Sequence, residues 1–175
     1  MNTKILIGAL SAALFSTALF TSCSSDDDDS TPAATIDNIV GEYVGTTTGT
    51  LILIKSDGTE LPFDIVPNGD ETATITVNSD GTISVLEPTF YSASPVTFSA
   101  DEKYAYPGAI VKNIKPVQEG DALSFKQDGY SSMNGYYTVA GDIAGQFKGK
   151  DLTLDYTFLH AGGMIGTVHF EGRRK

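Results

Sequence analysis

Short runs of alternating apolar and polar residues fill the chain from about residue 36 to its end. The runs are rich in Thr and are separated by Gly and by Asp-Gly pairs. A period of two is typical of strands that bury one face, and no stretch keeps a 3.6-residue apolar period over three helical turns. The pattern therefore predicts an all-β domain.

Asp-Gly pairs predict three tight turns, at 55–58, 78–81 and 126–129. In each, Asp can close a type I turn and Gly can adopt the left-handed conformation. Such a turn fixes which residues face each other across the hairpin. The first places Leu51 opposite Phe63, and the second places Ile75 opposite Val85. Both registers gather apolar side chains on one face, which supports both hairpins.

The C-terminal third continues the same meander. A two-residue turn at 149–150 places Phe147 opposite Leu152, and a turn at 161–163 leads into the last strand. A consecutive meander with one apolar face favours closure, because closure removes exposed strand edges. We therefore expect an antiparallel, up-and-down barrel of roughly eight strands.

Prolines interrupt the middle of the chain, at Pro88, Pro95, Pro107 and Pro116. Proline lacks the N–H that a central strand must donate, so this stretch predicts edge strands and bulges. We expect a long loop around 100–108, a strand over 110–117 and another strand over 122–126.

The first residues have the three parts of an export signal. Lys4 supplies a positive charge, and an apolar run follows from Ile5 to Phe20. This run is shorter than the roughly twenty residues that span a membrane. Phe20-Thr21-Ser22-Cys23 resembles a lipobox, the site where a signal peptidase cleaves before a diacylated cysteine. The resemblance implies a signal peptide over 1–22 and a lipid on Cys23; the alternative is an ordinary secretory leader with a free thiol.

A polar and acidic run follows the cysteine: Ser24, Ser25, Asp26, Asp27, Asp28 and Asp29. Like charges in series stay solvated and extended. Beside an acylated cysteine, the run resembles the surface-export signal of Bacteroidetes lipoproteins, which implies the outer face of the outer membrane. A solvated spacer is the alternative reading. Residues 23–35 would then be a flexible tether and residues 36–175 the barrel domain.

Composition narrows the classes of function. The chain of 175 residues carries 22 carboxylates against 11 Lys and Arg, a net charge of −11. Nucleic-acid binding requires a cationic surface, so that class is excluded. The chain also lacks a Gly-x-Ser-x-Gly elbow and a phosphate-binding glycine loop. We therefore expect a protein that is not an enzyme and uses no cofactor.

Strand parity separates the two histidines, so we expect no conventional metal site. His169 points outward, across from Asp155, and an exposed pair of this kind contributes about 0–1 kcal/mol. His160 points inward with Tyr156 at a strand end, near the mouth of the barrel. A histidine there could line a ligand site or bond a loop carbonyl; a hydrolase centred on His160 is the least favoured function.

Tyrosines gather in the irregular middle and after the third Asp-Gly pair. On exposed loops they would suit sugars or protein partners, whereas at the barrel ends they would be core residues. The candidate binding residues are Tyr91, Tyr104, Tyr106, Tyr130 and Tyr136, together with Tyr43, Tyr156 and His160 on the barrel strands.

Gly41-Glu42-Tyr43 at the first strand, the meander, and the final segment 166–172 resemble the calycin-like β-barrel lipoprotein domain of Bacteroidetes. The resemblance implies a lipocalin-like barrel on a lipid anchor, in a family whose function is largely unassigned. Lipocalins pack a first-strand Trp against a basic residue of the last strand. Here Tyr43 occupies the Trp position, and Arg173 and Arg174 lie near that of the basic partner.

These observations lead to a membrane-anchored, non-enzymatic binding or accessory lipoprotein. Its partners would be the lipid membrane, through acylated Cys23, and a small apolar or amphipathic ligand inside the barrel. The alternative is a protein- or glycan-interaction module that uses the tyrosine-bearing loops and has a packed barrel.

Overall fold

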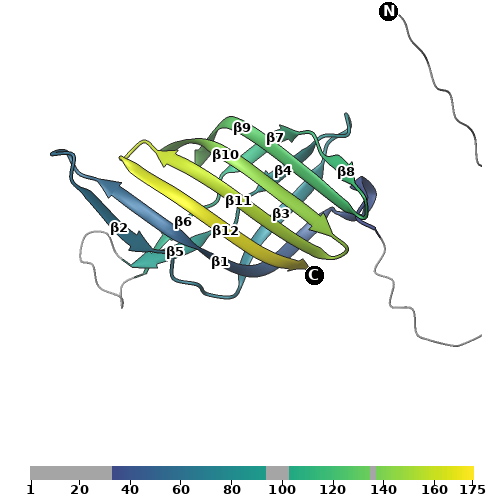
Figure 1. Cartoon of the computed structure of the whole chain (residues 1–175), viewed down its shortest axis with the longest axis horizontal. Helices are drawn as coiled ribbons and strands as arrows, with labels where there is room; N and C mark the ends of the chain where they lie inside the picture. Colours follow the sequence, from purple (N-terminus) through teal and green to yellow (C-terminus); the bar gives the residue numbers. More distant parts are fainter. Residues whose placement is uncertain (1–32, 94–102, 135–136) are drawn as a thin grey trace, which may run out of the picture. The chain divides into compact units, whose positions relative to one another are not determined.

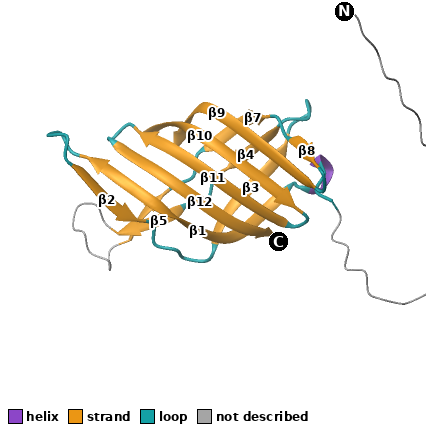
Figure 2. Ribbon diagram, viewed as in Figure 1, coloured by secondary structure: helices purple, strands orange, loops and turns teal. Residues whose placement is uncertain are grey.

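The computed structural model describes residues 33–93, 103–134 and 137–175. The predicted signal peptide (1–22), the predicted lipidation site Cys23, the acidic run (24–29) and Tyr136 lie outside the described residues. A short 3-10 turn, η1 (Ile36–Asn38), precedes the first strand, and the rest is strands and turns (Figure 2). The strands are β1 (Gly41–Ile54), β2 (Glu60–Asp64), β3 (Glu71–Val77), β4 (Ile83–Leu86), β5 (Phe90–Ala93), β6 (Lys103–Tyr106), β7 (Ile110–Ile114), β8 (Val117–Glu119), β9 (Ala122–Asn134), β10 (Tyr137–Lys148), β11 (Asp151–His160) and β12 (Met164–Arg174).

One antiparallel sheet of ten strands runs in the order β7-β4-β3-β1-β12-β11-β10-β9-β8, with β2 attached to β1. The sheet curls, so that β3, β4 and β7 lie behind β10, β11 and β12 (Figure 1). Its two edges approach where the Ser132 hydroxyl donates to the Ile110 carbonyl at 2.7 Å. The predicted all-β, barrel-like fold is confirmed. Within the described residues, however, no strand ladder joins β7 to β9, so the sheet forms a half-barrel.

Strand β1 is long because it pairs with two strands, one after the other, along one of its edges. It pairs with β3 over Gly41–Gly45 and with β2 over Thr50–Ile54, while β12 runs along its other edge. The backbones of β1 and β12 come close at Gly45, where an added Cβ would lie 1.9 Å from the Glu171 carbonyl oxygen. Only glycine fits this approach, which explains a residue that otherwise weakens a strand.

The first two predicted turns are confirmed. The N–H of Lys55 donates to the Thr59 carbonyl at 2.9 Å, and the N–H of Asn78 donates to the Thr82 carbonyl at 2.8 Å. The predicted cross-strand pairs are also present: Leu51 with Phe63, Ile75 with Val85, and Phe147 with Leu152.

The prediction of a third turn at 126–129 is wrong. Strand β9 continues through Asp128 and Gly129, and its register with β10 shifts there as a bulge. Gly129 has the expected left-handed φ of 68°, and its N–H donates to the Asp142 carboxylate at 2.7 Å. A left-handed glycine is compatible with either a bulge or a turn, and here the contact with the neighbouring strand β10 stabilises the bulge. Tyr130, predicted to lie in a loop, is therefore a strand residue.

The middle of the chain also differs from the prediction. Part of the expected loop at 100–108 is strand β6, which pairs with β5 in a separate two-stranded sheet. The rings of Phe90 and Tyr106 stack at 5.1 Å, and Phe90 lies 6.1 Å from Phe158 of the main sheet. This packing against the main sheet explains how short strands form between Pro88 and Pro107.

The predicted strands at 110–117 and 122–126 need smaller corrections. The first divides into β7 and β8 at Lys115 and Pro116, because Pro116 has no N–H to donate. Asn113, with a left-handed φ of 61°, lies within β7, where the register with β4 shifts. The second extends to Asn134, through the bulge at Gly129.

Aromatic rings fill the inner face of the sheet. Phe147 and Tyr43 are 0% exposed, and their ring centroids are 5.7 Å apart. Phe125 contributes a third ring, 5.6 Å from Phe147. The Tyr43 hydroxyl donates to the Ile39 carbonyl at 2.8 Å, which satisfies the buried hydroxyl.

Candidate functional site

Most of the predicted tyrosines lie in the core rather than on a surface. Four are at most 7% exposed: Tyr43, Tyr106, Tyr130 and Tyr156. Tyr91 on β5 is half-buried, and Tyr104 on β6 is 50% exposed. The structure therefore leaves Tyr104 as the most exposed candidate among the tyrosines whose side chains it describes.

Tyr43 occupies the position that the resemblance assigns to the first-strand Trp. It lies opposite Arg174 of the last strand. Burial raises the pKa of its hydroxyl to about 12, and the positive charge of Arg174 partly opposes this shift. Tyr43 is thus a structural residue of the core that stays protonated at physiological pH.

His160 lies at the end of β11, on the same side of the strand as the buried Tyr156, as predicted. The imidazole is partly exposed, and the N–H of Gly162 donates to its Nδ1 at 3.1 Å. The ring thus accepts a hydrogen bond from the backbone of the turn that follows β11. Partial burial lowers the pKa of His160 from its ordinary value.

His169 lies between two carboxylates on the outer face. Its Nδ1 is 2.7 Å from Asp155 Oδ1, and its Nε2 is 3.2 Å from Glu171 Oε1. The predicted pair with Asp155 is confirmed, and Glu171 joins it. The hydrogen bond to Asp155 is the largest influence on the His169 pKa and raises it, against a smaller opposing effect of burial.

We expect Asp155→Asn to lower the His169 pKa toward its ordinary value of 6.5, because a neutral amide stabilises the imidazolium less than a carboxylate does. Glu171→Gln should lower it less, since the Glu171 hydrogen bond has the smaller influence. An NMR titration of the ring protons measures both shifts. A pKa that is the same in Asp155→Asn as in the parent protein would refute the assignment.

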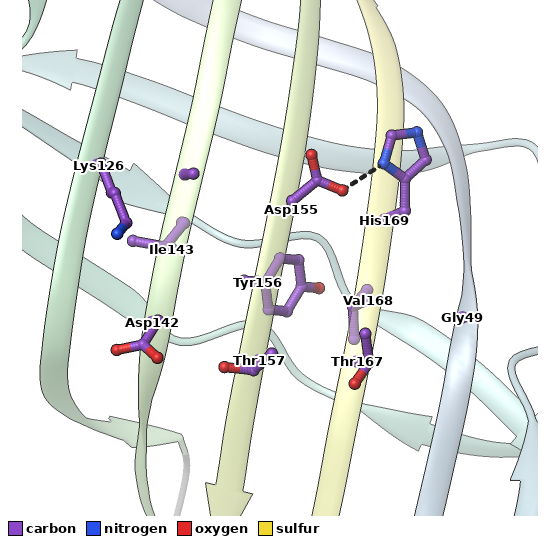
Figure 3. Close-up of a pocket in the computed structure, with 11 residues that line it drawn as sticks. Gly49, Lys126, Asp142, Ile143, Asp155, Tyr156, Thr157, Thr167, Val168 and His169 are labelled. Carbon is purple, nitrogen blue, oxygen red and sulfur yellow. Dashed lines mark hydrogen bonds and ion pairs between the residues drawn. The ribbon is translucent and has the colours of Figure 1, made fainter.

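An open groove of about 270 Å³ hollows the outer face beside this histidine (Figure 3). The strand registers arrange its outward side chains in two rows: His169, Asp155, Ala144 and Lys126, and then Thr167, Thr157 and Asp142. Ala144 is short and stands between Asp155 and Lys126, which leaves space above the strand. The floor of the groove is mainly apolar and includes Ile143, Ala144 and Val168, and the charged and hydroxyl side chains of the two rows border it.

Lys126 and Asp142, two charged residues of the groove, already have polar partners beside it. Lys126 forms an ion pair with Asp128 at 2.9 Å, and Asp142 accepts the hydrogen bond from Gly129. Within residues 33–93, 103–134 and 137–175, no group of three His, Cys, Asp or Glu side chains is arranged to hold a metal ion.

Sequence reasoning missed a buried carboxyl group. Glu87 follows β4 and is 4% exposed. Its Oε1 accepts a hydrogen bond from the Tyr130 hydroxyl at 2.7 Å, and its Oε2 accepts one from the Ala109 N–H at 3.2 Å. Burial raises the pKa of Glu87 to about 7, although both hydrogen bonds favour the charged form. The buried Tyr156 hydroxyl, which is close enough for the Glu87 charge to raise its pKa, has no hydrogen-bond partner within the described residues.

None of the helical segments in the described ranges has the length and apolar character needed to cross a membrane. No family model and no curated protein matches the sequence. Among solved structures, the chain is similar to a candidate outer membrane protein from Bacteroides fragilis, with a TM-score of 0.51 and 14% sequence identity. The match covers 79% of this chain and 52% of the other, so this chain spans about half the length of its neighbour.

This likeness shows the fold. The protein belongs to the class of antiparallel, barrel-like β domains, and it shares that fold with a Bacteroidetes β-rich protein. The resemblance to the calycin-like lipoprotein family stays a prediction, since the likeness at 14% identity does not test it.

Proposed function

We propose that this protein is a non-enzymatic binding or accessory lipoprotein, anchored to the outer membrane through acylated Cys23. The lipobox-like segment 20–23 carries the proposal, and the acidic run 26–29 supports exposure at the cell surface. The fold shared with a candidate outer membrane protein supports the same compartment.

The outer face of β9 to β12 is the proposed binding surface. Buried aromatic rings occupy the inner face, where Tyr43, Phe125 and Phe147 pack at 5.6 to 5.7 Å. The outer groove, by contrast, is open to solvent, and Asp142, Asp155 and His169 are among the residues that line it.

We expect Cys23→Ala to abolish acylation and cleavage before residue 23, because the peptidase that cuts at a lipobox requires a diacylated cysteine; the variant keeps residues 1–22 and does not reach the outer membrane fraction. Acyl labelling and fractionation of cells that carry the parent or the variant measure this effect. Replacing Asp26–Asp29 with Asn is the matched control for the surface signal: the protein should stay acylated but become resistant to protease added outside the cells. A Cys23→Ala protein that remains acylated would contradict the anchor.

A small apolar or amphipathic ligand in the barrel is a second candidate function. The polar cluster of Glu87, Tyr130 and Tyr156 favours it, since a buried hydroxyl without a partner is available to a ligand. Native mass spectrometry of the protein from its own membrane tests this candidate. A bound mass that Tyr156→Phe weakens would support it, and a ligand-free parent protein would refute it.

A further inference from the structure

A row of apolar side chains crosses the outer face next to the groove. The strand registers align Pro62, Ile52, Ile165, Leu159 and Ala140 on β2, β1, β12, β11 and β10. All five alternate with buried or inward neighbours and so point outward; Leu159 is 52% exposed and Ile165 is 38% exposed. With adjacent strands about 4.8 Å apart, the row is roughly 20 Å long.

The apolar row differs from the rest of the same face. The next row across β1, β12, β11 and β10 consists of Thr50, Thr167, Thr157 and Asp142, which is the polar pattern expected of a solvated sheet face. Single exposed apolar residues are ordinary on protein surfaces, whereas a contiguous strip with a polar border marks an interaction site.

The groove begins directly beside the apolar row, since Thr167, Thr157 and Asp142 belong to its lining. The charged groups in and around the groove are mainly acidic: Asp128, Asp142, Asp155 and Glu171 face Lys126 and His169. An anionic membrane, or a second copy of this chain with its net charge of −11, would bring negative charge against negative charge. Lys or Arg side chains of a partner would instead find carboxylates at this border.

We propose that the apolar row and the adjoining groove form one docking face for a protein segment with an apolar stripe flanked by Lys or Arg. The stripe covers Leu159 and Ile165, and a basic side chain enters the groove near Asp142. This inference rests on the proposed function, a lipoprotein that binds a partner through its outer face, and it names the chemistry of that partner.

Two synthetic amphipathic helices of equal length test the docking face. Both carry a leucine stripe, flanked in one by Lys and in the other by Glu. Each is titrated against the acylated protein in phosphatidylcholine nanodiscs, with empty discs as the blank. We expect the Lys-flanked helix to bind at least tenfold more tightly than the Glu-flanked one, and added salt to reduce the difference.

The double variant Leu159→Ser/Ile165→Ser should weaken binding of the Lys-flanked helix at least tenfold. Val117→Ser is the matched control, because Val117 on β8 is 56% exposed and lies outside the apolar row. This control should bind like the parent protein, and far-UV circular dichroism should show all variants folded. Equal binding of both helices, or unchanged binding by the double variant, would overturn the inference.

The same variants also test two other possible partners of this face, a second copy of the chain and a lipid surface. Self-association of the parent protein that the double variant abolishes would assign the face to a second copy, and binding to phosphatidylglycerol vesicles would assign it to lipid; either result overturns the proposal. Suppose that the protein binds the Lys-flanked and Glu-flanked helices equally, while Cys23 is acylated and the protein is exposed at the cell surface. In that case only the docking inference fails. Absence of the lipid would instead remove the proposed function itself.

Discussion

Phe147→Ala is expected to lower the free energy of unfolding by about 3–5 kcal/mol. The Phe147 side chain is fully buried and lies between the rings of Tyr43 on β1 and Phe125 on β9. Its loss would therefore leave a cavity between strands that are far apart in the sheet order. Rigid rings on both sides limit how far the core can collapse into the space.

Urea unfolding followed by far-UV circular dichroism measures this loss, since the chain contains no Trp for a fluorescence signal. Val117→Ala, at an exposed position on β8, is the control and should change the free energy by less than about 0.5 kcal/mol. A loss below about 1 kcal/mol for Phe147→Ala would mean that the inner face is not packed as described.

The second large effect is a pH dependence of stability that Glu87 produces. Its pKa is about 7 in the folded protein and near the ordinary 4.5 in the unfolded chain. Between these values the folded state binds the proton more tightly, so stability falls as the pH rises from about 4.5 to about 7 and is level above that. A shift of this size corresponds to roughly 3 kcal/mol.

Glu87→Gln should remove this dependence, because the amide is neutral at every pH and keeps an oxygen that can accept a hydrogen bond. The measurement is the difference in unfolding free energy between the parent protein and the variant at several pH values. Titration of His169 and of surface carboxylates cancels in this difference. We expect the difference to change by roughly 3 kcal/mol across the window; two parallel curves would contradict the buried carboxyl.

Local patterns were sufficient to predict the first two hairpins and the C-terminal meander, with their registers. The turns after Ile54 and Val77 depend on residues that are adjacent in the chain, so Asp-Gly chemistry and the apolar alternation determine them together. The segment 126–129 has the same chemistry and forms a bulge instead, because Asp142 of β10 binds the Gly129 N–H. That partner is thirteen residues away and leaves no local signal.

Distance along the chain also explains what was missed at the sites. The partners of Glu87 are 22 and 43 residues away, so nothing near Pro88 indicates that this carboxyl is buried. The apolar row is a different case. Ile52, Leu159 and Ile165 each break the polar side of an alternating run, a signal that is visible in the sequence. Their alignment into one surface becomes apparent only when four strand registers are known together.

The closure of the barrel was overestimated for a physical reason. Pro116, which has no N–H to donate, separates β7 from β8, and the short β7 is left at one edge of the sheet. Where the two edges of the sheet approach each other, side-chain hydrogen bonds connect them in place of a strand ladder: Ser132 to the Ile110 carbonyl, and Tyr130 to Glu87.

The intact mass of the protein extracted from the outer membrane tests the central claim most directly. If the protein is lipid-anchored, we expect a chain that begins at Cys23 and is heavier than residues 23–175 by a diacylglyceryl group. A chain cleaved elsewhere, or one that begins at Cys23 without lipid, would contradict the account.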